Sequence, residues 1–150
     1  MNEASIANYI TKTFPGVETS TDFGYTFFFH GADRKLPFAT LISSDYEYDR
    51  ISNLDRPGVF RLNIGVSRET FQSLFGAAKV EVGLFDFTAL DVIMPHPEYA
   101  NNISYLCFLP VKRRLRKYAH CLPKLMTLPF RGTDDGTKTN EAGSVHAATS

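Results

Sequence analysis

The chain has few of the features that mark well-known classes of functional site. Its only two cysteines, Cys107 and Cys121, form no CxxC pair and have no histidine at metal-ligand spacing. It also lacks a glycine-rich phosphate loop, a GxSxG motif and an HExxH motif. We therefore expect no metal, no cofactor and no recognisable nucleophile–base pair, and we interpret Cys107, in the apolar run YLCFL, as a buried small hydrophobe.

Long apolar runs are missing as well. No stretch approaches the roughly 18 apolar residues that a membrane span requires. The first ten residues, MNEASIANYI, have neither the basic region nor the apolar core of a signal peptide. These patterns predict a cytoplasmic protein with no membrane partner.

The chain has no net charge, with 16 Lys and Arg and 16 Asp and Glu. The charges are unevenly distributed: residues 1–109 hold 8 basic and 13 acidic residues, a net charge of −5, whereas residues 110–150 hold 8 and 3, a net charge of +5. We therefore divide the chain into a domain over residues 1–109 and an aberrant basic tail over residues 110–150, which we expect to be poorly ordered.

The first predicted element is a helix over residues 3–13, whose apolar positions Ile6, Tyr9, Ile10 and Phe14 recur at helical spacing. Asn2 or Ser5 can cap its start. Strand-like runs follow at residues 25–30, 38–43, 59–66, 90–94 and 105–109, and the first two read as a hairpin. The pattern predicts an α+β fold in which helices pack on an antiparallel sheet.

Residues 59–66 form the clearest predicted strand, because Phe60, Leu62 and Ile64 alternate with Arg61 and Asn63. Ser67 can cap a second helix over residues 67–75, which Gly76 ends. The predicted core consists of Phe27 or Phe28, Phe60, Leu62, Ile64, Phe71, Leu74 and Ile93.

Two segments, LDRPGVFRLNIGVSRETFQSLFG and FDFTALDVIMPHPEYA, resemble the domain-of-unknown-function family 6194. TFFFHGADRKLPFATLISSDY fits the same pattern, so the resemblance covers about residues 4–109. More distantly, the order of elements is similar to that of YjbR-like domains. The resemblance implies a bacterial α+β domain and supplies no catalytic residue.

The same resemblance offers an interpretation of the tail. In the family, a motif of the type NPS-x-x-TF and an amphipathic helix follow the last strand, whereas this chain departs at Pro110 into a run containing KRRLRK. Reading residues 110–150 one nucleotide out of frame, with free choice of the leading bases, gives PSEATFAEVRPLLAEAYDIAV and so restores the family motif. We interpret the tail as a shifted reading frame. The alternative is a nucleic-acid arm, but only Tyr118 and Phe130 are available for base stacking, so nucleic acid is disfavoured as a partner.

The candidate site residues are Arg56, Arg61, Asn63, Asp91 and His96. Arg61 and Asn63 share the strand face opposite Leu62, where a guanidinium beside an amide suits a carboxylate or phosphate. The alternative is an exposed sheet face on which Arg61 pairs with Asp45, Asp49 or Asp55. His96 lies between two prolines. It is either part of a structural turn or a ligand or acid–base group. His30 is interpreted as a surface residue.

Two functions follow from these residues. The first is a non-enzymatic module that binds a small anionic ligand or a protein partner on the polar sheet face. The second is a small enzyme that uses His96, Asp91 and Arg61 on an anionic small molecule. We prefer the first, and a concave pocket that joins the three side chains would favour the second.

Overall fold

The computed structural model describes residues 2–31, 34–77 and 79–110, and the predictions for the tail beyond Pro110 lie outside this range. The helices are α1 (Glu3–Thr13), α2 (Arg68–Phe75), α3 (Ala100–Ile103) and the short 3-10 helix η1 (Val82–Leu84). The strands are β1 (Val17–Asp22), β2 (Tyr25–His30), β3 (Ala39–Ile42), β4 (Arg61–Gly65), β5 (Ile93–Pro95) and β6 (Tyr105–Phe108). Within the described residues, no helix is long and apolar enough to cross a membrane.

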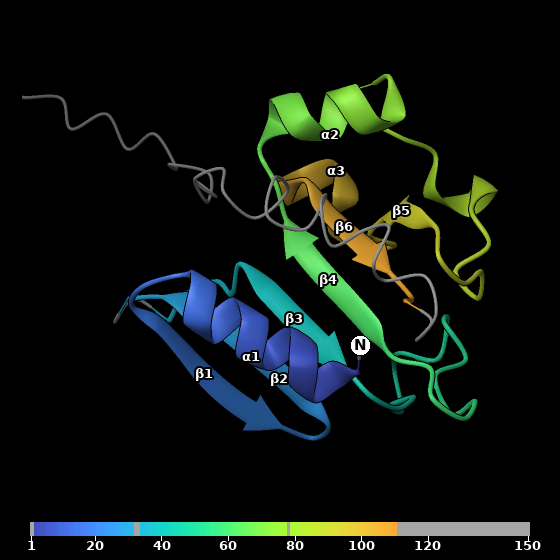
Figure 1. Ribbon diagram of the computed structural model, residues 1–150. Helices are drawn as coiled ribbons and strands as arrows, with labels where there is room; N and C mark the ends of the chain where they lie inside the picture. The colour runs from blue at the N-terminus through green and yellow to red at the C-terminus, as the bar shows by residue number, and fades with distance from the viewer. Residues whose placement is uncertain (1, 32–33, 78, 111–150) are drawn as a thin grey trace, which may run out of the picture.

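The six strands of the described part form one sheet in the order β1-β2-β3-β4-β6-β5 (Figure 1). Every neighbouring pair is antiparallel, which confirms the predicted α+β fold with an antiparallel sheet. The predicted hairpin of β2 and β3 is present, with Tyr25 opposite Ile42 and Phe28 opposite Ala39. β3 and β4 lie at the centre of the sheet, where side chains on both faces can be covered.

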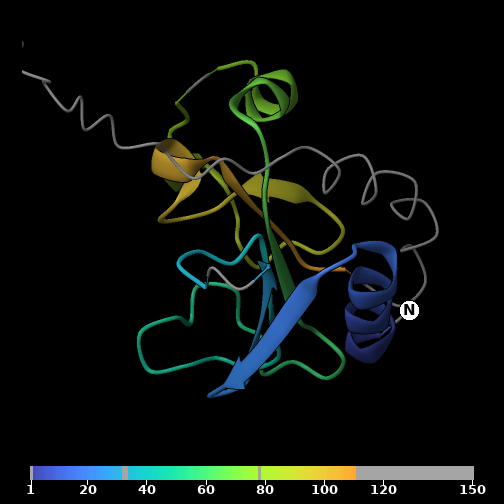
Figure 2. The same ribbon diagram turned by 90° about the vertical axis from the view of Figure 1, so that its left-hand side faces the viewer.

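The helix ends follow from local chemistry. The side chain of Asn2 accepts a hydrogen bond from the Ser5 N–H at 2.9 Å and so caps α1. Ser67 caps α2 in the same way, and Gly76 ends it in the left-handed conformation at φ 72°. α1 and α2 lie at opposite ends of the molecule (Figures 1 and 2).

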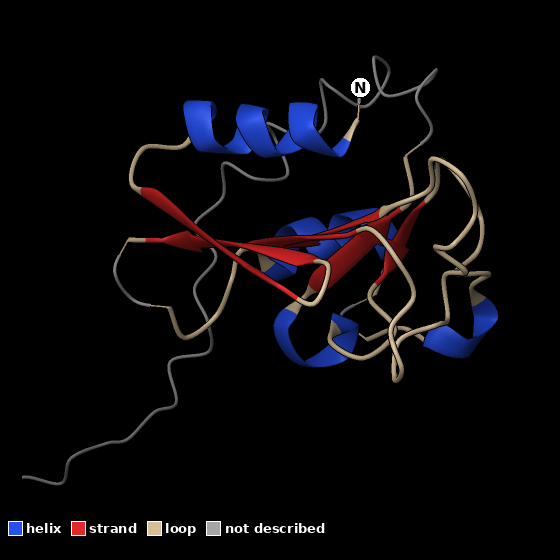
Figure 3. Cartoon of the chain, turned by 90° about the horizontal axis from the view of Figure 1, so that it is seen from below, coloured by secondary structure: helices blue, strands red, loops and turns tan. Residues whose placement is uncertain are grey.

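One face of the sheet is covered by α1 (Figure 3). Ile6 and Ile10 of the helix pack there in a cluster with Phe28, Leu62 and other buried apolar residues. Of the predicted core, Phe28, Phe60, Leu62, Ile64 and Phe71 are buried, and Ile93 is partly buried against the same cluster. Leu74 was predicted wrongly: it is 42% exposed, because Phe71 and Phe75, four residues apart, form the side of α2 that packs on the core.

Three other elements differ from the sequence prediction. β1 (VETSTD) is a strand that the sequence pattern did not indicate; it is paired along its whole length with the aromatic strand β2. The strand predicted at residues 90–94 is shorter and starts later, because β5 runs from Ile93 to Pro95. The one-turn helix α3 was also not predicted.

Candidate functional site

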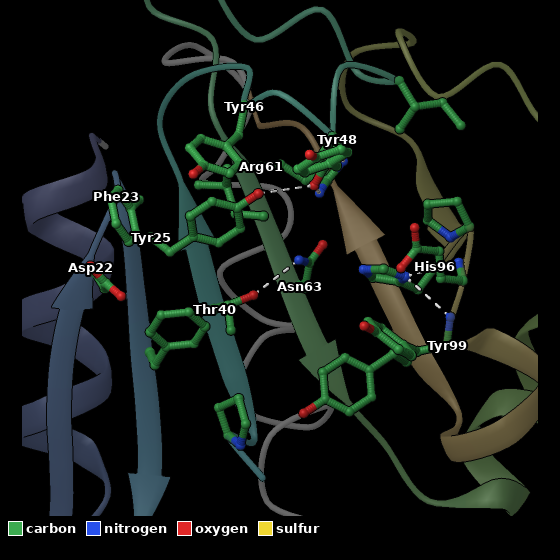
Figure 4. A pocket seen from close by; sticks show the side chains of 18 of the residues that line it. Asp22, Phe23, Tyr25, Thr40, Tyr46, Tyr48, Arg61, Asn63, His96 and Tyr99 are labelled. Carbon is green, nitrogen blue, oxygen red and sulfur yellow. Dashed lines mark hydrogen bonds and ion pairs between the residues drawn. The ribbon is translucent and has the colours of Figure 1, made fainter.

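A cavity of about 870 Å³ opens on the sheet face opposite α1 (Figure 4). Its floor is formed by β3 and β4, through Thr40, Arg61 and Asn63. Its walls come from β2 with the loop after β3 on one side, and from the segment between β5 and β6 on the other. Among the described residues, seven aromatic side chains line it: Phe23, Tyr25, Phe27, Tyr46, Tyr48, Tyr99 and Tyr105. Its volume lies within the range of sites for small molecules.

Asn63 stands in the middle of the floor, where the period of two in β4 places it beside Arg61 and away from Leu62. Its side chain is almost fully buried, with 4% of its surface exposed. The amide nitrogen donates to Thr40 Oγ1 at 2.9 Å. The amide oxygen is buried and has no hydrogen-bond partner among the described residues. Figure 4 shows this oxygen on the side of the amide away from Thr40, directed into the cavity.

Arg61 lies at one end of the floor and is 1% exposed. One terminal nitrogen donates to Asp49 Oδ1 at 3.1 Å and to Ser52 Oγ at 2.9 Å, and the other forms an ion pair with Asp49 Oδ2. The prediction of an exposed face with weak ion pairs was therefore wrong in one respect: Asp49 is the partner, but the guanidinium is buried beneath the loop after β3.

The Arg61–Asp49 pair also involves the aromatic wall. The hydroxyl of Tyr25 donates to Asp49 Oδ2 at 3.4 Å. The pKa of Tyr25 is raised above its ordinary value, first by burial and then by the negative charge of Asp49. Tyr25 therefore stays a neutral donor that orients the carboxylate at physiological pH.

His96 closes the opposite side of the cavity and is buried. Its Nδ1 accepts hydrogen bonds from the backbone N–H groups of Glu98 at 3.1 Å and Tyr99 at 3.3 Å. Burial lowers the pKa of His96 to about 4, with a further lowering by Arg61 and an opposing effect of Asp49. The ring is therefore neutral at pH 7 and carries its proton on Nε2. In Figure 4 this second nitrogen points across the cavity toward Asn63.

The aromatic side chains form two walls around this polar floor. On one side the rings of Tyr25 and Phe27 are stacked at 5.8 Å, and Tyr46 meets Tyr25 edge-on at 6.3 Å. On the other side the His96 ring lies 4.9 Å from Tyr99, which in turn lies 6.3 Å from Tyr105. Burial raises the pKa of Tyr105 above its ordinary value, which keeps this hydroxyl protonated as well.

The structure brings three of the five predicted site residues to the cavity. Arg61, Asn63 and His96 line it, whereas Arg56 and Asp91 do not. Arg56 instead donates to the carbonyl oxygens of Ser52, Asn53 and Thr88, and so fastens two loops together.

Asp91 lies at the other end of β5 from His96. It has a left-handed backbone at φ 59°, and its N–H donates to the carbonyl of Leu109 at 2.9 Å. Aspartate tolerates this conformation better than most residues, which accounts for its place in the turn. The predicted group of His96, Asp91 and Arg61 is therefore not assembled as lining of this cavity.

Neither the aromatic walls nor the role of Asp49 in positioning Arg61 was predicted from the sequence. Seven aromatic residues from four separate segments converge on the cavity, and only their abundance before residue 110 was visible in the sequence. Cys107, interpreted as a buried hydrophobe, is buried next to Met94 and Leu109, and burial raises its pKa to about 12. His30 is exposed, as expected. In the described residues, no group of three or more His, Cys, Asp or Glu side chains is arranged to hold a metal ion.

Comparison with known proteins places the chain in a family without giving it an activity. No curated protein matches it. A crystal structure of a protein from Pseudomonas syringae is similar at 20% sequence identity with a TM-score of 0.47, covering 83% of this chain and 95% of that one. A family model described as a family of unknown function matches residues 1–124. That match extends past Leu109 into the tail, whose interpretation as a shifted reading frame stays a prediction. Because the match covers most of its length, the chain belongs to the DUF6194 family.

Proposed function

We propose that this protein is a binding module for a small molecule that carries a planar ring, held in the cavity over β3 and β4. The observation that carries the proposal is the cavity itself: about 870 Å³, with aromatic walls and a small number of fixed polar groups on its floor. This combination of an apolar lining with a few orienting polar atoms is typical of sites for small organic ligands.

The walls favour a planar ring over a flexible chain. Tyr25 and Phe27 present nearly parallel rings, with 9° between their planes, along one side of the cavity. An aromatic ligand would add an offset-stacked or edge-on contact, worth about 0.5–1.5 kcal/mol beyond the area it buries. A ring also loses little conformational entropy when it is bound, so more of the contact energy is retained as affinity.

The charges around the cavity favour a neutral ligand over the anion that Arg61 alone suggests. Asp49 already neutralises Arg61 in a buried ion pair. The other charged residues that line the cavity are Asp22, Arg50 and Glu98. The Nε–H of Arg61 is buried without a hydrogen-bond partner among the described residues, but the charge behind it is already neutralised by Asp49. An anion would therefore lose its hydration and gain only a weakened charge-assisted hydrogen bond in return.

Binding is better supported than catalysis. The enzyme hypothesis combined Arg61 and His96 with Asp91, and Asp91 is not part of the cavity lining. The Nδ1 atom of His96 accepts from two backbone amides, and a group with a pKa of about 4 is a weak base at pH 7. These features support a fixed hydrogen-bonding role for His96, with a small molecule as the partner in place of a protein or nucleic acid.

The test is a screen of the full chain against planar heterocycles and saturated analogues of equal size, followed by titration calorimetry. A reducing buffer suits the cytoplasmic location that we propose. We expect planar compounds to raise the unfolding temperature and saturated analogues to have little effect. Tyr99→Leu should weaken binding severalfold, whereas Tyr9→Leu on α1, remote from the cavity, should leave affinity unchanged. Failure of every planar compound to bind, or equal weakening by both variants, would contradict the proposal.

A further inference from the structure

Two polar atoms with opposite hydrogen-bonding character face the cavity, one from its floor and the other from the adjoining wall. One is Oδ1 of Asn63 on the floor, an acceptor without a partner among the described residues. The other is Nε2 of His96, which Figure 4 shows directed toward Asn63. Asn63 and His96 are both more than nine-tenths buried, so a ligand that occupies the cavity must supply their hydrogen-bond partners.

Contacts within the protein assign both characters. The amide nitrogen of Asn63 donates to Thr40 Oγ1, and its oxygen is left without a partner among the described residues. The two backbone N–H groups that donate to Nδ1 of His96 require this atom to be unprotonated, which leaves a proton on Nε2. The site therefore offers one acceptor and one donor in a defined arrangement.

From this arrangement we infer that the ligand is a planar heterocycle with a lactam edge, in which a ring N–H lies next to a ring C=O. The N–H would donate to Asn63 Oδ1 and the C=O would accept from His96 Nε2, while the ring faces contact the aromatic walls. This inference rests on the proposed function and narrows it to one chemical class.

The positions of the Asn63 acceptor and the His96 donor also disfavour other planar ligands. An aryl carboxylate would place an oxygen lone pair against the oxygen of Asn63, a repulsive contact in a buried site. A ring without a polar edge would cover Asn63 Oδ1 and His96 Nε2 and leave both atoms unpaired. Discrimination against an analogue that lacks a hydrogen-bonding group is strong where the site has buried polar groups to satisfy.

A matched set of three probes tests the inference. 2-Quinolinone has the complete edge, 1-methyl-2-quinolinone lacks only the donor, and quinoline lacks both the N–H and the carbonyl. The full chain is titrated with each by calorimetry and by amide chemical shifts. We expect 2-quinolinone to bind about tenfold or more tightly than either analogue, the effect of one lost hydrogen bond in a buried site.

Variants assign the discrimination to the two residues. Asn63→Leu combined with Thr40→Val should abolish the preference over 1-methyl-2-quinolinone, and His96→Phe should reduce the preference over quinoline. Asn8→Leu, at an exposed position on α1, is the matched control and should preserve both ratios. The ratios report recognition even if a variant changes the affinity for all three probes.

The outcomes separate this inference from the proposed function. If all three probes bind with similar affinity, or if the preference persists in both cavity variants, the lactam assignment is wrong and the planar-ring site stands. If none of the three binds and the wider screen is also negative, the proposed function itself fails. A preference for 2-quinolinone that is lost in the Asn63 and His96 variants and kept in Asn8→Leu supports both.

Discussion

The two faces of the sheet are built from the same strands and serve different purposes. On the face toward α1, Phe28, Leu62 and Ile64 pack against Ile6 and Ile10 in one buried apolar cluster. On the other face the alternating residues of β4 are Arg61 and Asn63, and aromatic side chains surround a cavity. Because consecutive side chains of a strand point to opposite faces, neighbouring residues of β4 face a filled core on one side and an open cavity on the other.

The second face is only partly closed by its own apolar residues. Ile42, Leu54, Met94 and Leu109 form a smaller buried cluster with Phe87 and Cys107. The remainder of the face is covered by loops, whose side chains converge without filling the space. The comparison indicates that the α1 face contributes most of the stability and that the cavity face serves recognition.

The largest effect is expected from neighbouring phenylalanines on β2. Phe28 faces α1 and is completely buried, so Phe28→Ala should lower the free energy of unfolding by about 3–5 kcal/mol. Phe27 faces the cavity and is partly exposed, so Phe27→Ala should cost only about 1–2 kcal/mol. Urea denaturation of both variants is the measurement. Equal losses would show that the cavity face contributes to stability as much as the core does.

The buried ion pair should give the next largest effect. Asp49→Ala leaves the guanidinium of Arg61 buried without its carboxylate and should cost about 2–4 kcal/mol, discounted for the partial exposure of Asp49. Glu18→Ala breaks the exposed Glu18–Arg34 pair and should cost less than about 0.5 kcal/mol.

A double variant distinguishes the effect of the two charges on stability from the effect of burying the two side chains. Replacing Arg61 and Asp49 together by Leu removes the unpaired charge, so it should recover much of the stability that Asp49→Ala loses. Denaturant midpoints again give the comparison. A double variant no more stable than Asp49→Ala would show that the charges themselves hold the loop after β3 in place.

The α1 face was predictable from the sequence because it depends on local patterns. The alternation around Leu62 identifies the strand and its two faces, and Ser67 and Gly76 delimit the helix that follows. Leu74 was misplaced because helical spacing gives an apolar stripe without showing which edge of the stripe reaches the core; Phe71 and Phe75 do, and Leu74 does not. β1 was missed because VETSTD has no apolar alternation and becomes a strand through its pairing with β2.

The cavity was far less predictable, because its residues are brought together by loops. Arg61, Asn63 and His96 were singled out as polar groups in unusual positions, and all three line the cavity. Arg56 and Asp91 looked equivalent to them in the sequence, but Arg56 donates to carbonyl groups of two loops and the Asp91 backbone pairs with Leu109. The aromatic walls come from segments as far apart as Phe23 and Tyr105, and no single-sequence pattern encodes such convergence.

The pH dependence of stability should report the burial of His96. Its pKa is about 4 in the folded protein, against the ordinary value of 6.5 in the unfolded chain. Between these values the unfolded state binds more protons, so the free energy of unfolding falls as the pH decreases from about 6.5 to 4. The two pKa values correspond to a loss of up to roughly 3 kcal/mol.

The groups whose charges act on this ring are Arg61 and Asp49, and Tyr99 and Tyr105 pack against it. His96→Phe should therefore flatten the dependence of stability on pH in this window, measured by urea denaturation at several pH values. His30→Gln removes an exposed imidazole and should leave the dependence in place. An unchanged slope in His96→Phe would assign the acid sensitivity to carboxylates.

The smallest effect on stability is expected from replacing the Asn63–Thr40 pair, although the effect on ligand recognition should be large. Asn63 and Thr40 satisfy each other by one hydrogen bond between adjacent strands of the cavity floor. Replacing both by apolar residues of similar shape, Asn63→Leu with Thr40→Val, removes donor and acceptor together and should change the free energy of unfolding by less than about 1 kcal/mol. Asn63→Leu alone leaves the Thr40 hydroxyl buried without this partner and should cost about 1–3 kcal/mol.

If the double variant is as stable as the wild-type protein, the polar floor is dispensable for folding, and retention of an unpaired amide oxygen there is explained by ligand recognition. A double variant that loses several kcal/mol would instead make the Asn63–Thr40 pair a structural link between β3 and β4 and would remove the main distinction between the two faces.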